Sequence, residues 1–409
     1  MSAITACRAC DGKRLTLVLS LGQTPLANSL VEPLRRGEPE PRFPLEVVLC
    51  ESCALLQINE TVPPDVMFRD YSYFSSFSET MLRHAKTIAD RLVDERRLGA
   101  SSLAAEIASN DGYLLKNYVA RGVPVLGIEP ARNVAVVAEE KGVRTVVEFF
   151  GRELGAELAR KGMRADVLHA NNVMAHVPDI RGVLAGAQAF LKDDGVMVIE
   201  SPYVKAMLDH CEFDTIYHEH LFYWSLTALG AVARRVGLAI VDVERLSIHG
   251  GSLRVLLQRE GAGAPSAAVT SLLAEEQAWG VGRVEPYLAL AARVAGLKKE
   301  LVTLLRKLKS EGKTIAAYGA AAKGSTLLNH FGIGADLVDF VCDRSTYKQG
   351  RDMPGVGIPI VAAEELAARR PDYCLLLTWN FAEEILAQQS AYRAAGGKFI
   401  VPVPEVRVL

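Results

Sequence analysis

The stretch SLAAEIASNDGYLL, residues 102–115, decides how the middle of the chain folds. An apolar run gives way to short polar residues and a glycine, and a second apolar run follows. This order is typical of a strand that turns directly into a helix. Further strand candidates follow at helix-length intervals, at residues 123–129, 143–149, 165–172 and 195–201. The alternation predicts a parallel, doubly wound α/β sheet.

Two more apolar runs, residues 238–246 and 252–258, flank a glycine turn and predict a hairpin that gives this sheet an antiparallel edge strand. Residues 265–310 are rich in Ala, Leu, Lys and Glu with helical periodicity, which predicts one or two long helices. A second, smaller α/β sheet is predicted from the apolar runs within residues 313–332, 337–345, 373–380 and 398–404.

Composition narrows the class of protein. The 409 residues are 50% hydrophobic and 23% charged, with a formal net charge of -2 and no long run of one sign. This balance argues against a nucleic-acid coat or a basic membrane-binding patch. The sequence has neither an apolar stretch long enough to span a bilayer nor the order of a signal peptide at its start. We therefore expect a cytoplasmic protein of two or three domains without nucleic-acid or membrane partners.

Four of the seven cysteines form two CxxC pairs, Cys7 with Cys10 and Cys50 with Cys53. Four soft thiolates can close tetrahedrally on one zinc ion, and a filled shell predicts a structural metal. Redox-active or unpaired cysteines are the alternative. Between the pairs we expect a small β-rich insert, with strands near residues 15–22 and 44–50. The remaining cysteines are isolated and should be small buried residues: Cys211, Cys342 and Cys374.

A cofactor site is predicted where the first strand of the central block ends. The turn carries Ser109, Asn110, Asp111 and Gly112, and its glycine would let a ligand approach the backbone. The next strand ends in Glu129, at the distance where an acid can bind ribose hydroxyls. The GxGxxG pattern that seats a pyrophosphate is missing. A ligand without phosphates and with a positive centre, such as S-adenosylmethionine, therefore fits better, with an ordinary αβ turn as the alternative.

Two later strand ends add candidates for the same site. Phe149 and Phe150 could sandwich an adenine ring or could be a buried core pair. Asn171 and Asn172 end the fourth strand, beside the methyl donor in this class of fold. His176, a few residues later, could face the reaction centre or could be a hydrogen-bonded residue in the wall of the pocket.

The second α/β block has its own strand–turn–helix at residues 319–326. Backbone amides at a helix N-terminus attract phosphate, and Lys323 adds positive charge. Ser325 and Thr326 follow in the first turn. We interpret this turn as the site for the diphosphate of a nucleotide-sugar, with a tight packed helix start as the alternative.

The next strand of that block ends in Asp343, with Arg344, Lys348 and Arg351 beyond it. The basic residues could meet the nucleotide or be solvated charges. An acid at this place is also found in NAD sites, so a dehydrogenase domain is a second interpretation. The missing GxGxxG argues against it.

The most unusual stretch is IYHEHLFYWS, residues 216–225, in which a tyrosine, two histidines and a glutamate precede an aromatic run. His218 and His220 could both face a metal on an extended strand, although no third ligand is near in sequence. A structural polar cluster is the other alternative.

Taken together in their order along the chain, these motifs resemble the sugar C-methyltransferases of antibiotic deoxysugar pathways. Besides the CxxC pairs, the resemblance rests on LGQTPLAN (21–28), DYSYFSSFS (70–78), EIASNDGYLL (106–115), NNVMAHVPD (171–179), IYHEHLFYWS (216–225), HGGSLR (249–254) and GAAAKGSTLLN (319–329). It spans nearly the whole chain.

The resemblance implies three domains: a zinc-binding domain (1–66), an S-adenosylmethionine-dependent class I methyltransferase domain (67–260) and a C-terminal Rossmann-like domain (261–409). It implies methylation at C3 of a nucleotide-linked 4-keto-deoxysugar, with dTDP as the expected carrier, bound between the last two domains. The sequence leaves a monomer open. Two other functions stay open: an N- or O-methyltransferase acting on a nucleotide-sugar, and a non-catalytic zinc protein that binds a nucleotide.

The resemblance also assigns roles in the mid-chain motif. Forming a carbon–carbon bond at C3 requires removal of a proton next to the C4 ketone, and imidazole titrates near neutral pH. His220 is the implied base, Tyr217 could donate a hydrogen bond to the enolate, and Glu219 could orient a side chain or hold the sugar. Tyr71 and Tyr73 are implied to contact substrate or methyl donor, with an aromatic core stripe as the alternative.

Overall fold

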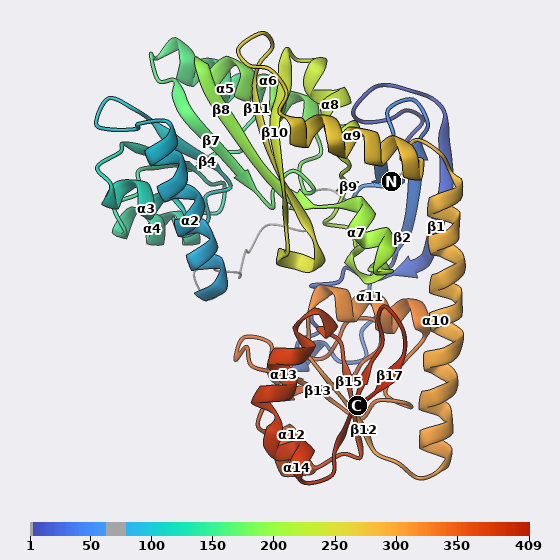
Figure 1. The fold of residues 1–409 in the computed structure, drawn as a ribbon. Coiled ribbons are helices and arrows are strands. Elements are labelled where there is room, and N and C mark those ends of the chain that lie inside the picture. The colour runs from blue at the N-terminus through green and yellow to red at the C-terminus, as the bar shows by residue number, and fades with distance from the viewer. Residues whose placement is uncertain (1–2, 63–78) are drawn as a thin grey trace.

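The strands of the chain form three sheets in residues 3–62 and 79–409, which the computed structural model describes (Figure 1). None of the helices in these two ranges is long and apolar enough to cross a membrane. In Figure 1 the N-terminal sheet lies beside the central sheet, and the C-terminal sheet lies below both.

The N-terminal sheet is antiparallel, in the order β1-β2-β3-β9. Its strands are β1 (Leu15–Thr24), β2 (Phe43–Cys50), β3 (Leu56–Ile58) and β9 (Phe222–Tyr223). The first two strands confirm the predicted β-rich insert. The fourth comes from the mid-chain aromatic run, where Leu56 pairs with Tyr223 and Gln57 with Phe222. The zinc block and the central block therefore share a sheet, which the sequence did not predict.

The central sheet has the order β10-β11-β8-β7-β4-β5-β6. Its parallel part confirms the predicted doubly wound sheet, and the edge strand β10 pairs antiparallel with β11, as β11 does with β8. The strands are β4 (Ala104–Ile107), β5 (Val125–Ile128), β6 (Thr145–Val146), β7 (Ala165–Asn171), β8 (Leu191–Pro202), β10 (Leu238–Leu246) and β11 (Ser252–Arg259).

Helices cover both faces of the central sheet (Figure 1). Asp179 and Ser225 cap α6 and α8 by accepting backbone N–H groups. Helices α5 and α6 pack so closely that a Cβ on Gly155 would lie 2.3 Å from the carbonyl oxygen of Gly186. The elements are α2 (Glu79–Glu95), α3 (Leu115–Ala120), α4 (Arg132–Glu140), α5 (Arg152–Arg160), α6 (Ile180–Phe190), α7 (Val204–Asp209), η3 (Phe213–Thr215), α8 (Leu226–Arg234), η4 (Ile248–Gly250) and α9 (Ala267–Trp279).

Helix α10 (Glu285–Ser310) runs from the upper part of the molecule down to the C-terminal sheet (Figure 1). With α9 it confirms the predicted helices. The C-terminal sheet has the order β14-β13-β12-β15-β16-β17, parallel except for β17, which confirms a second Rossmann-like sheet. Its elements are β12 (Ile315–Tyr318), α11 (Ala322–Phe331), β13 (Val341–Asp343), β14 (Ile360–Ala362), α12 (Glu365–Arg369), β15 (Tyr373–Leu376), η5 (Trp379–Phe381), α13 (Ala382–Gln388), α14 (Ser390–Ala394), β16 (Lys398–Val401) and β17 (Arg407–Val408).

Residues 25–42, between β1 and β2, form an arm that contains η1 (Pro33–Arg35) and contacts the C-terminal domain. Arg36 of the arm binds Asp352 through two hydrogen bonds, of 2.7 and 2.8 Å. Val31 and Asp352 also exchange backbone hydrogen bonds of 3.0 and 2.9 Å. The first and last parts of the chain are thus joined directly. The domain boundaries at residues 66/67 and 260/261 stay predictions.

Candidate functional site

The four cysteines predicted to bind zinc come together in one cluster. Their sulfur atoms all lie within 4.8 Å of one another, with Cys7 to Cys53 at 3.7 Å and Cys10 to Cys50 at 3.6 Å. A tetrahedron with Zn–S bonds of about 2.3 Å has edges of about 3.8 Å, so the cluster fits a zinc ion. The backbone N–H of Ala9 points to the Cys7 sulfur at 3.4 Å, which favours a thiolate there.

Gln57 connects this cluster to the rest of the molecule. Its amide nitrogen donates to the Cys7 sulfur at 3.2 Å, and its backbone pairs with Phe222 of β9. The side chain is fully buried. Strand β9 begins at Phe222, two residues after His220, so Gln57 connects the cysteine cluster to the strand that follows the mid-chain histidines.

The predicted cofactor turn after β4 has an unusual backbone. Ala108, Asn110 and Gly112 all have positive φ, of 52°, 50° and 74°. Positive φ is costly for residues other than glycine and clusters at functional sites. The carboxylate of Glu129, at the end of β5, accepts the N–H groups of Asn110 and Ala131, both at 2.9 Å. The acid and the turn are therefore fixed against each other at the carboxyl edge of the sheet.

Two buried polar atoms at this edge have no hydrogen-bond partner: the Ser109 hydroxyl and the Asn171 side-chain oxygen. Ser109 is 0% and Asn171 8% exposed. A buried polar group without a partner is destabilising, and such groups are usually satisfied by a ligand or water. Burial also raises the pKa of Glu129. The hydroxyl and amino groups of S-adenosylmethionine would supply the missing hydrogen bonds, so the edge fits this cofactor.

Gly112 and Asp111 serve the fold of this turn. A Cβ on Gly112 would lie 3.0 Å from Val143 and 3.2 Å from the Cβ of Ala138, so the glycine allows close packing on α4. The Asp111 carboxylate forms a 2.9 Å ion pair with Lys141. Close packing on α4 is therefore a second reason for a glycine at position 112, besides the predicted approach of a ligand.

The two phenylalanines predicted to sandwich adenine are in different environments. Phe150 is buried and packs on Phe190, with ring centroids 6.3 Å apart, whereas Phe149 is 70% exposed. A sandwich of both rings does not fit this arrangement, because Phe150 belongs to the core. Asn172 takes positive φ, 57°, at the end of β7, and its N–H donates to the carbonyl of Glu200.

In the mid-chain loop Tyr217 and His220 form a hydrogen-bonded pair. The Tyr217 hydroxyl lies 2.8 Å from Nε2 of His220, and Nδ1 lies 2.8 Å from the carbonyl oxygen of Thr215. A carbonyl only accepts, so Nδ1 carries a proton, and in the neutral ring Nε2 then has the lone pair that accepts from Tyr217. This tautomer leaves the basic nitrogen on the side of the tyrosine hydroxyl.

His176 brings the end of β7 against this pair. Its ring packs edge-on to His220, with centroids 4.8 Å apart. Burial lowers the pKa of His176 to about 4, which keeps the ring neutral at physiological pH. The cofactor edge and the mid-chain loop are therefore adjacent.

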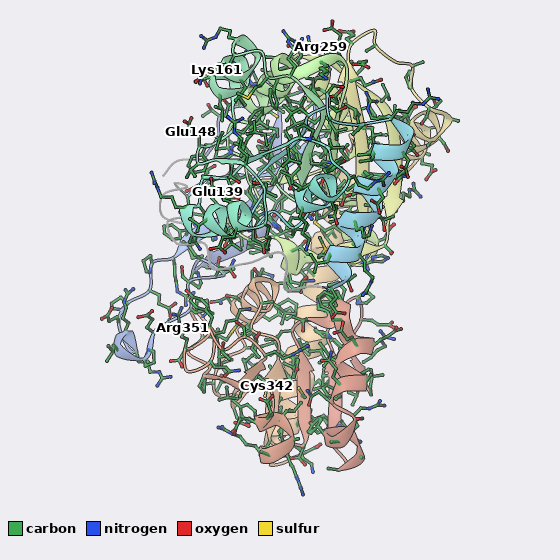
Figure 2. The ribbon with its side chains drawn as sticks, turned by 90° about the vertical axis from the view of Figure 1, so that its left-hand side faces the viewer. Glu139, Glu148, Lys161, Arg259, Cys342 and Arg351 are labelled. Atoms are coloured by element: carbon green, nitrogen blue, oxygen red, sulfur yellow. The ribbon has the colours of Figure 1, made fainter. Side chains whose placement is uncertain are left out.

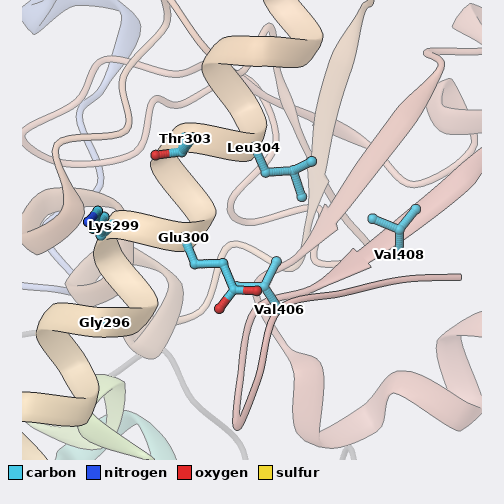
Figure 3. Close-up of a pocket in the computed structure, with 7 residues that line it drawn as sticks. All are labelled: Gly296, Lys299, Glu300, Thr303, Leu304, Val406 and Val408. Atoms are coloured by element: carbon cyan, nitrogen blue, oxygen red, sulfur yellow. The ribbon is translucent and has the colours of Figure 1, made fainter.

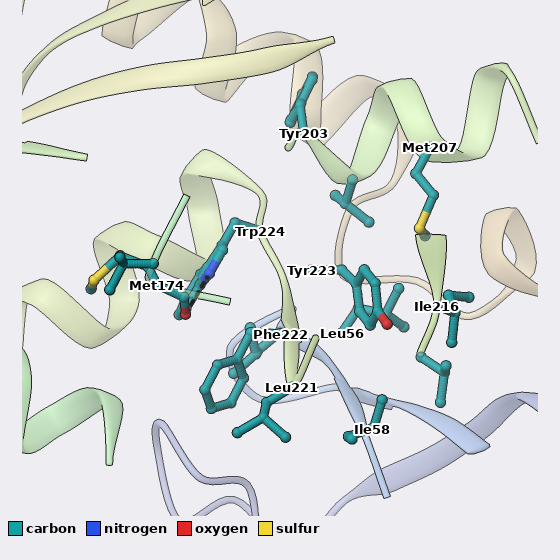
Figure 4. Close-up of a cluster of buried hydrophobic side chains, with 14 of the residues drawn as sticks. Leu56, Ile58, Met174, Tyr203, Met207, Ile216, Leu221, Phe222, Tyr223 and Trp224 are labelled. Carbon is teal, nitrogen blue, oxygen red and sulfur yellow. Dashed lines mark hydrogen bonds between the residues drawn. The ribbon is translucent and has the colours of Figure 1, made fainter. Parts of the chain in front are cut away.

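An apolar layer lies under the loop. Trp224 donates its indole N–H to the carbonyl of Met174 at 3.2 Å, and Leu221 N–H donates to Ala175 at 2.7 Å. Figure 4 shows the side chains of β3, β9 and the segment around Met174 packed against each other here. The aromatic run that follows the histidines therefore fixes the polar loop to the hydrophobic core.

Glu219 and His218 point to the N-terminal block. Asn28 donates to a Glu219 oxygen at 2.6 Å, while burial raises the pKa of Glu219. His218 Nε2 donates to the carbonyl of Pro44 at 3.2 Å, and burial lowers its pKa. His218 is thus a buried structural neighbour. Within the described ranges, the cysteine cluster is the one group of metal-binding side chains found, so the metal interpretation of His218 and His220 gains no support.

The turn at residues 319–326 of the C-terminal domain, the C-terminal turn, contacts the central domain through Thr326. The Lys323 ammonium donates to Asn380 at 3.0 Å and lies 4.4 Å from the centre of the Trp379 ring. Thr326 donates its hydroxyl to the carbonyl of Ile216 at 3.2 Å. Both side chains therefore have partners within the chain, and the predicted diphosphate contacts stay a prediction.

The other residues predicted to bind the nucleotide divide between buried and exposed. Ser325 is 1% exposed inside α11. Arg351 pairs with Glu32 of the arm at 3.4 Å and stacks on Tyr347, at the junction visible in Figure 2. Arg344 is exposed and stays a candidate for phosphate contact. Tyr71 and Tyr73 lie outside the described residues.

A groove of about 490 Å³ lies elsewhere, between α10 and β17 (Figure 3). None of the predicted site residues contributes to it. Its lining consists of Gly296, Lys299, Glu300, Thr303, Leu304, Val406 and Val408.

Comparison with known proteins identifies the family. C-methyltransferase NovU of Streptomyces niveus is 38% identical over 413 residues, covering 99% of this chain and 97% of NovU. The chain belongs to the C-methyltransferase family. Family models agree along its length: "Putative zinc binding domain" matches residues 7–68, "Methyltransferase domain" residues 79–243 and "C-methyltransferase C-terminal domain" residues 247–404.

Solved structures similar to part of this chain include two methyltransferases. Magnesium protoporphyrin IX methyltransferase of Synechocystis PCC 6803 with bound S-adenosylmethionine is 12% identical, covering 49% of this chain and 100% of its own, with a TM-score of 0.37. The CcbJ methyltransferase of Streptomyces caelestis is 14% identical, covering 43% of this chain and 90% of its own, with a TM-score of 0.35.

Family membership confirms several sequence predictions. The chain is an S-adenosylmethionine-dependent C-methyltransferase with an N-terminal zinc-binding domain. The dehydrogenase interpretation of the last domain is wrong, because that domain is the C-terminal domain of this methyltransferase family. A purely non-catalytic nucleotide-binding protein is disfavoured for the same reason.

Three contacts of the site were not predicted from the sequence. Asn28 lies in the LGQTPLAN motif, yet nothing local showed that it would reach Glu219. Thr215 contributes a backbone carbonyl, which residue type does not reveal. Trp379 follows the strand at residues 373–376, and only the fold brings it to the central domain.

Proposed function

We propose that this enzyme methylates C3 of a nucleotide-linked 4-keto-deoxysugar, with His220 as the base that forms the enolate. The observation that carries the proposal is the hydrogen-bonded series from the Thr215 carbonyl through His220 to the Tyr217 hydroxyl. It provides a neutral imidazole with a defined lone pair and an adjacent O–H donor, which enolisation next to a ketone requires.

The proposed proton transfer uses both groups of the pair. Tyr217 turns its hydroxyl from Nε2 to the ketone oxygen and donates a hydrogen bond to the oxygen that gains charge. Nε2 of His220 then takes the C3 proton, and the carbonyl of Thr215 stabilises the imidazolium that results, because it accepts from Nδ1.

Bond formation follows at the cofactor edge. S-adenosylmethionine supplies an electrophilic methyl group when it is bound. Ser109, Asn171 and Glu129 would hold it at the carboxyl ends of β4, β5 and β7. His176, which touches His220, keeps the methyl donor and the base close together, and such positioning accounts for much of the rate of methyl transfer.

Substrate recognition is proposed for residues around this centre. Glu219, oriented by Asn28, would accept a hydrogen bond from a sugar hydroxyl. The exposed Arg344 would meet the diphosphate. Tyr71 and Tyr73 remain proposed substrate contacts from the family resemblance.

The decisive experiment separates enolisation from methyl transfer. A panel of 4-keto nucleotide-sugars is incubated in deuterated water without S-adenosylmethionine, and deuterium at C3 is followed by NMR. Wild-type enzyme should wash deuterium into C3, and His220→Gln should slow this by a factor on the order of 10²–10⁴. His210→Asn, on a half-exposed histidine outside the site, is the control and should exchange normally.

Product analysis with S-adenosylmethionine then tests the alternatives. A new methyl carbon bonded to C3 supports the proposal. A methyl group on nitrogen or oxygen, without deuterium exchange at carbon, would replace it with a heteroatom methyltransferase. Undiminished exchange in a folded His220→Gln variant would remove His220 from the role of base.

A further inference from the structure

The segment 213–216, directly before Tyr217, is held by the C-terminal domain at several successive residues. Phe213 stacks on Phe331 of α11, with ring centroids 5.0 Å apart and an interplanar angle of 17°. Both rings are buried, at 0% and 3% exposure. The contact joins the 3-10 turn η3 to a helix that belongs to another sheet.

Asp214 adds a polar contact to the same interface. Its carboxylate is 0% exposed and accepts the indole N–H of Trp379 at 2.7 Å. The second oxygen has no hydrogen-bond partner. Lys323, which lies over the Trp379 ring, provides the nearby positive charge that opposes the cost of burying this anion.

Thr326 fixes the end of the segment. Its hydroxyl is nearly inaccessible and donates to the carbonyl of Ile216 at 3.2 Å. Thr215, between the two anchored residues, presents its carbonyl to Nδ1 of His220 at 2.8 Å. The carbonyl that decides which ring nitrogen is protonated is therefore part of a backbone that the C-terminal domain holds in place.

We propose that Trp379 and Thr326 are positioning residues that fix the tautomer and orientation of His220 through segment 213–216. The C-terminal domain then has a second role besides any contact with the nucleotide: it completes the base of the central domain. The catalytic consequence rests on the function proposed above, whereas the tautomer itself does not.

This role also explains the C-terminal turn in a way that a phosphate site does not. Lys323 contacts both Asn380 and the Trp379 ring, and Trp379 donates to the buried Asp214. A turn built for diphosphate would keep its lysine available to solvent-borne anions. Here Lys323 donates to the side-chain amide oxygen of Asn380, and Thr326 donates to the backbone carbonyl of Ile216.

The test reads the imidazole directly, in the full-length zinc-loaded protein without substrate. Nitrogen-15 spectra of histidine-labelled protein distinguish the two neutral tautomers, and His220→Gln identifies the signals of His220. Wild type should show Nδ1 protonated. Trp379→Phe and Thr326→Val should each raise the share of the other tautomer several-fold. Asp214→Asn, whose amide oxygen can still accept from Trp379, should keep the wild-type signature.

Controls separate this effect from a loss of folding. Trp279→Phe makes the same change at a tryptophan of α9, whose ring packs against Tyr287 of α10, and should leave the spectrum unchanged. Zinc content and thermal unfolding verify each variant; should Trp379→Phe not fold, the nearly isosteric Thr326→Val decides. Wild-type spectra with Nε2 protonated, or folded variants with an unaltered tautomer, would overturn the proposal.

Catalysis gives a second readout. Deuterium wash-in at C3 should fall about ten-fold in Trp379→Phe and Thr326→Val, while the affinity for S-adenosylmethionine stays unchanged. Wild-type enzyme that exchanges no keto-sugar would refute the proposed reaction and leave the tautomer result standing. Normal exchange with an altered tautomer would show that this positioning has no catalytic effect.

Discussion

The central and C-terminal domains contain the same strand–turn–helix unit, but the polar side chains around the two turns are paired differently. In both, a strand turns into a helix and the next strand ends in an acid that accepts a backbone N–H of the turn: Glu129 accepts from Asn110, and Asp343 accepts from Ala320 at 2.7 Å. The two units are built alike up to this point.

The difference lies in the polar side chains around each turn. At the central edge Ser109 and Asn171 keep buried oxygens without partners. At the C-terminal turn Lys323 and Thr326 are paired with groups of the same chain. Buried oxygens without partners are costly, and at the central edge they line the predicted cofactor turn, where a ligand would satisfy them. The pairing of Lys323 and Thr326 instead indicates a contact within the fold, although Asp214 in the same contact also has one oxygen without a partner. Local sequence alone does not distinguish the two.

Removing zinc should have the largest effect and should spare the cofactor turn. Cys50→Ser, or chelation, is expected to lose the metal and to lower the free energy of unfolding by several kcal/mol, because metal binding contributes directly to folding. Atomic emission and thermal unfolding measure both. Cys211→Ala, a buried cysteine outside the cluster, should keep its zinc.

Zinc loss should also affect the mid-chain loop and the cofactor turn differently. Gln57 connects the cluster to β9, so zinc loss should abolish enolisation at residues 217–220 while binding of S-adenosylmethionine, measured by calorimetry, persists. Full activity in a metal-free protein would show that the cysteine cluster does not support this loop.

Matched substitutions of the two acids test the comparison itself. Glu129→Gln should weaken S-adenosylmethionine binding by about 10- to 100-fold, since a hydrogen bond to a charged group contributes about 1.5–3 kcal/mol. Asp343→Asn should leave that affinity unchanged, because Asp343 lies in the C-terminal sheet and not at the predicted cofactor turn. It should lower the stability of the C-terminal domain, because it weakens the hydrogen bonds that Asp343 accepts from Ala320 and Ser345. Equal losses of affinity in the two variants would mean that both turns serve the ligand.

The sequence predicted the sheets because their pattern is local. Apolar strands at helix-length intervals gave β4, β5, β7 and β8 in order, and the CxxC pairs predicted the metal cluster from spacing alone. Both are read within short windows, where alternation and ligand chemistry act without knowledge of the fold.

The missed features depend on pairs that are distant in sequence. Strand β9 is two residues long, and its partner β3 lies in another block. Lys323 has the local pattern of an anion site, and only the fold shows that it contacts Trp379 and Asn380, which follow β15. A charge can be predicted from sequence, but its partner is decided by tertiary packing.

The smallest expected effect is on the stability of the central domain at acid pH. It comes from His169, which lies in β7 of the central sheet. Its ring is fully buried, with Nε2 2.8 Å from the Tyr118 hydroxyl, and burial lowers its pKa to about 4. An unfolded histidine, with a pKa of about 6.5, binds a proton between these values while the folded one does not. The free energy of unfolding should therefore fall as pH drops from 6.5 to 4, by about 1 kcal/mol between pH 7.5 and 5.5.

Glu106 acts in the opposite direction, so the test compares variants. Burial raises the pKa of Glu106 well above its usual value, so the folded protein keeps a proton that the unfolded chain releases above pH 4.5. That term favours the folded state as pH falls and partly offsets the effect of His169. Subtracting the pH profile of His169→Gln from that of wild type, in urea titrations, isolates the histidine. A difference that does not change with pH would show that His169 titrates alike in the folded and unfolded chains.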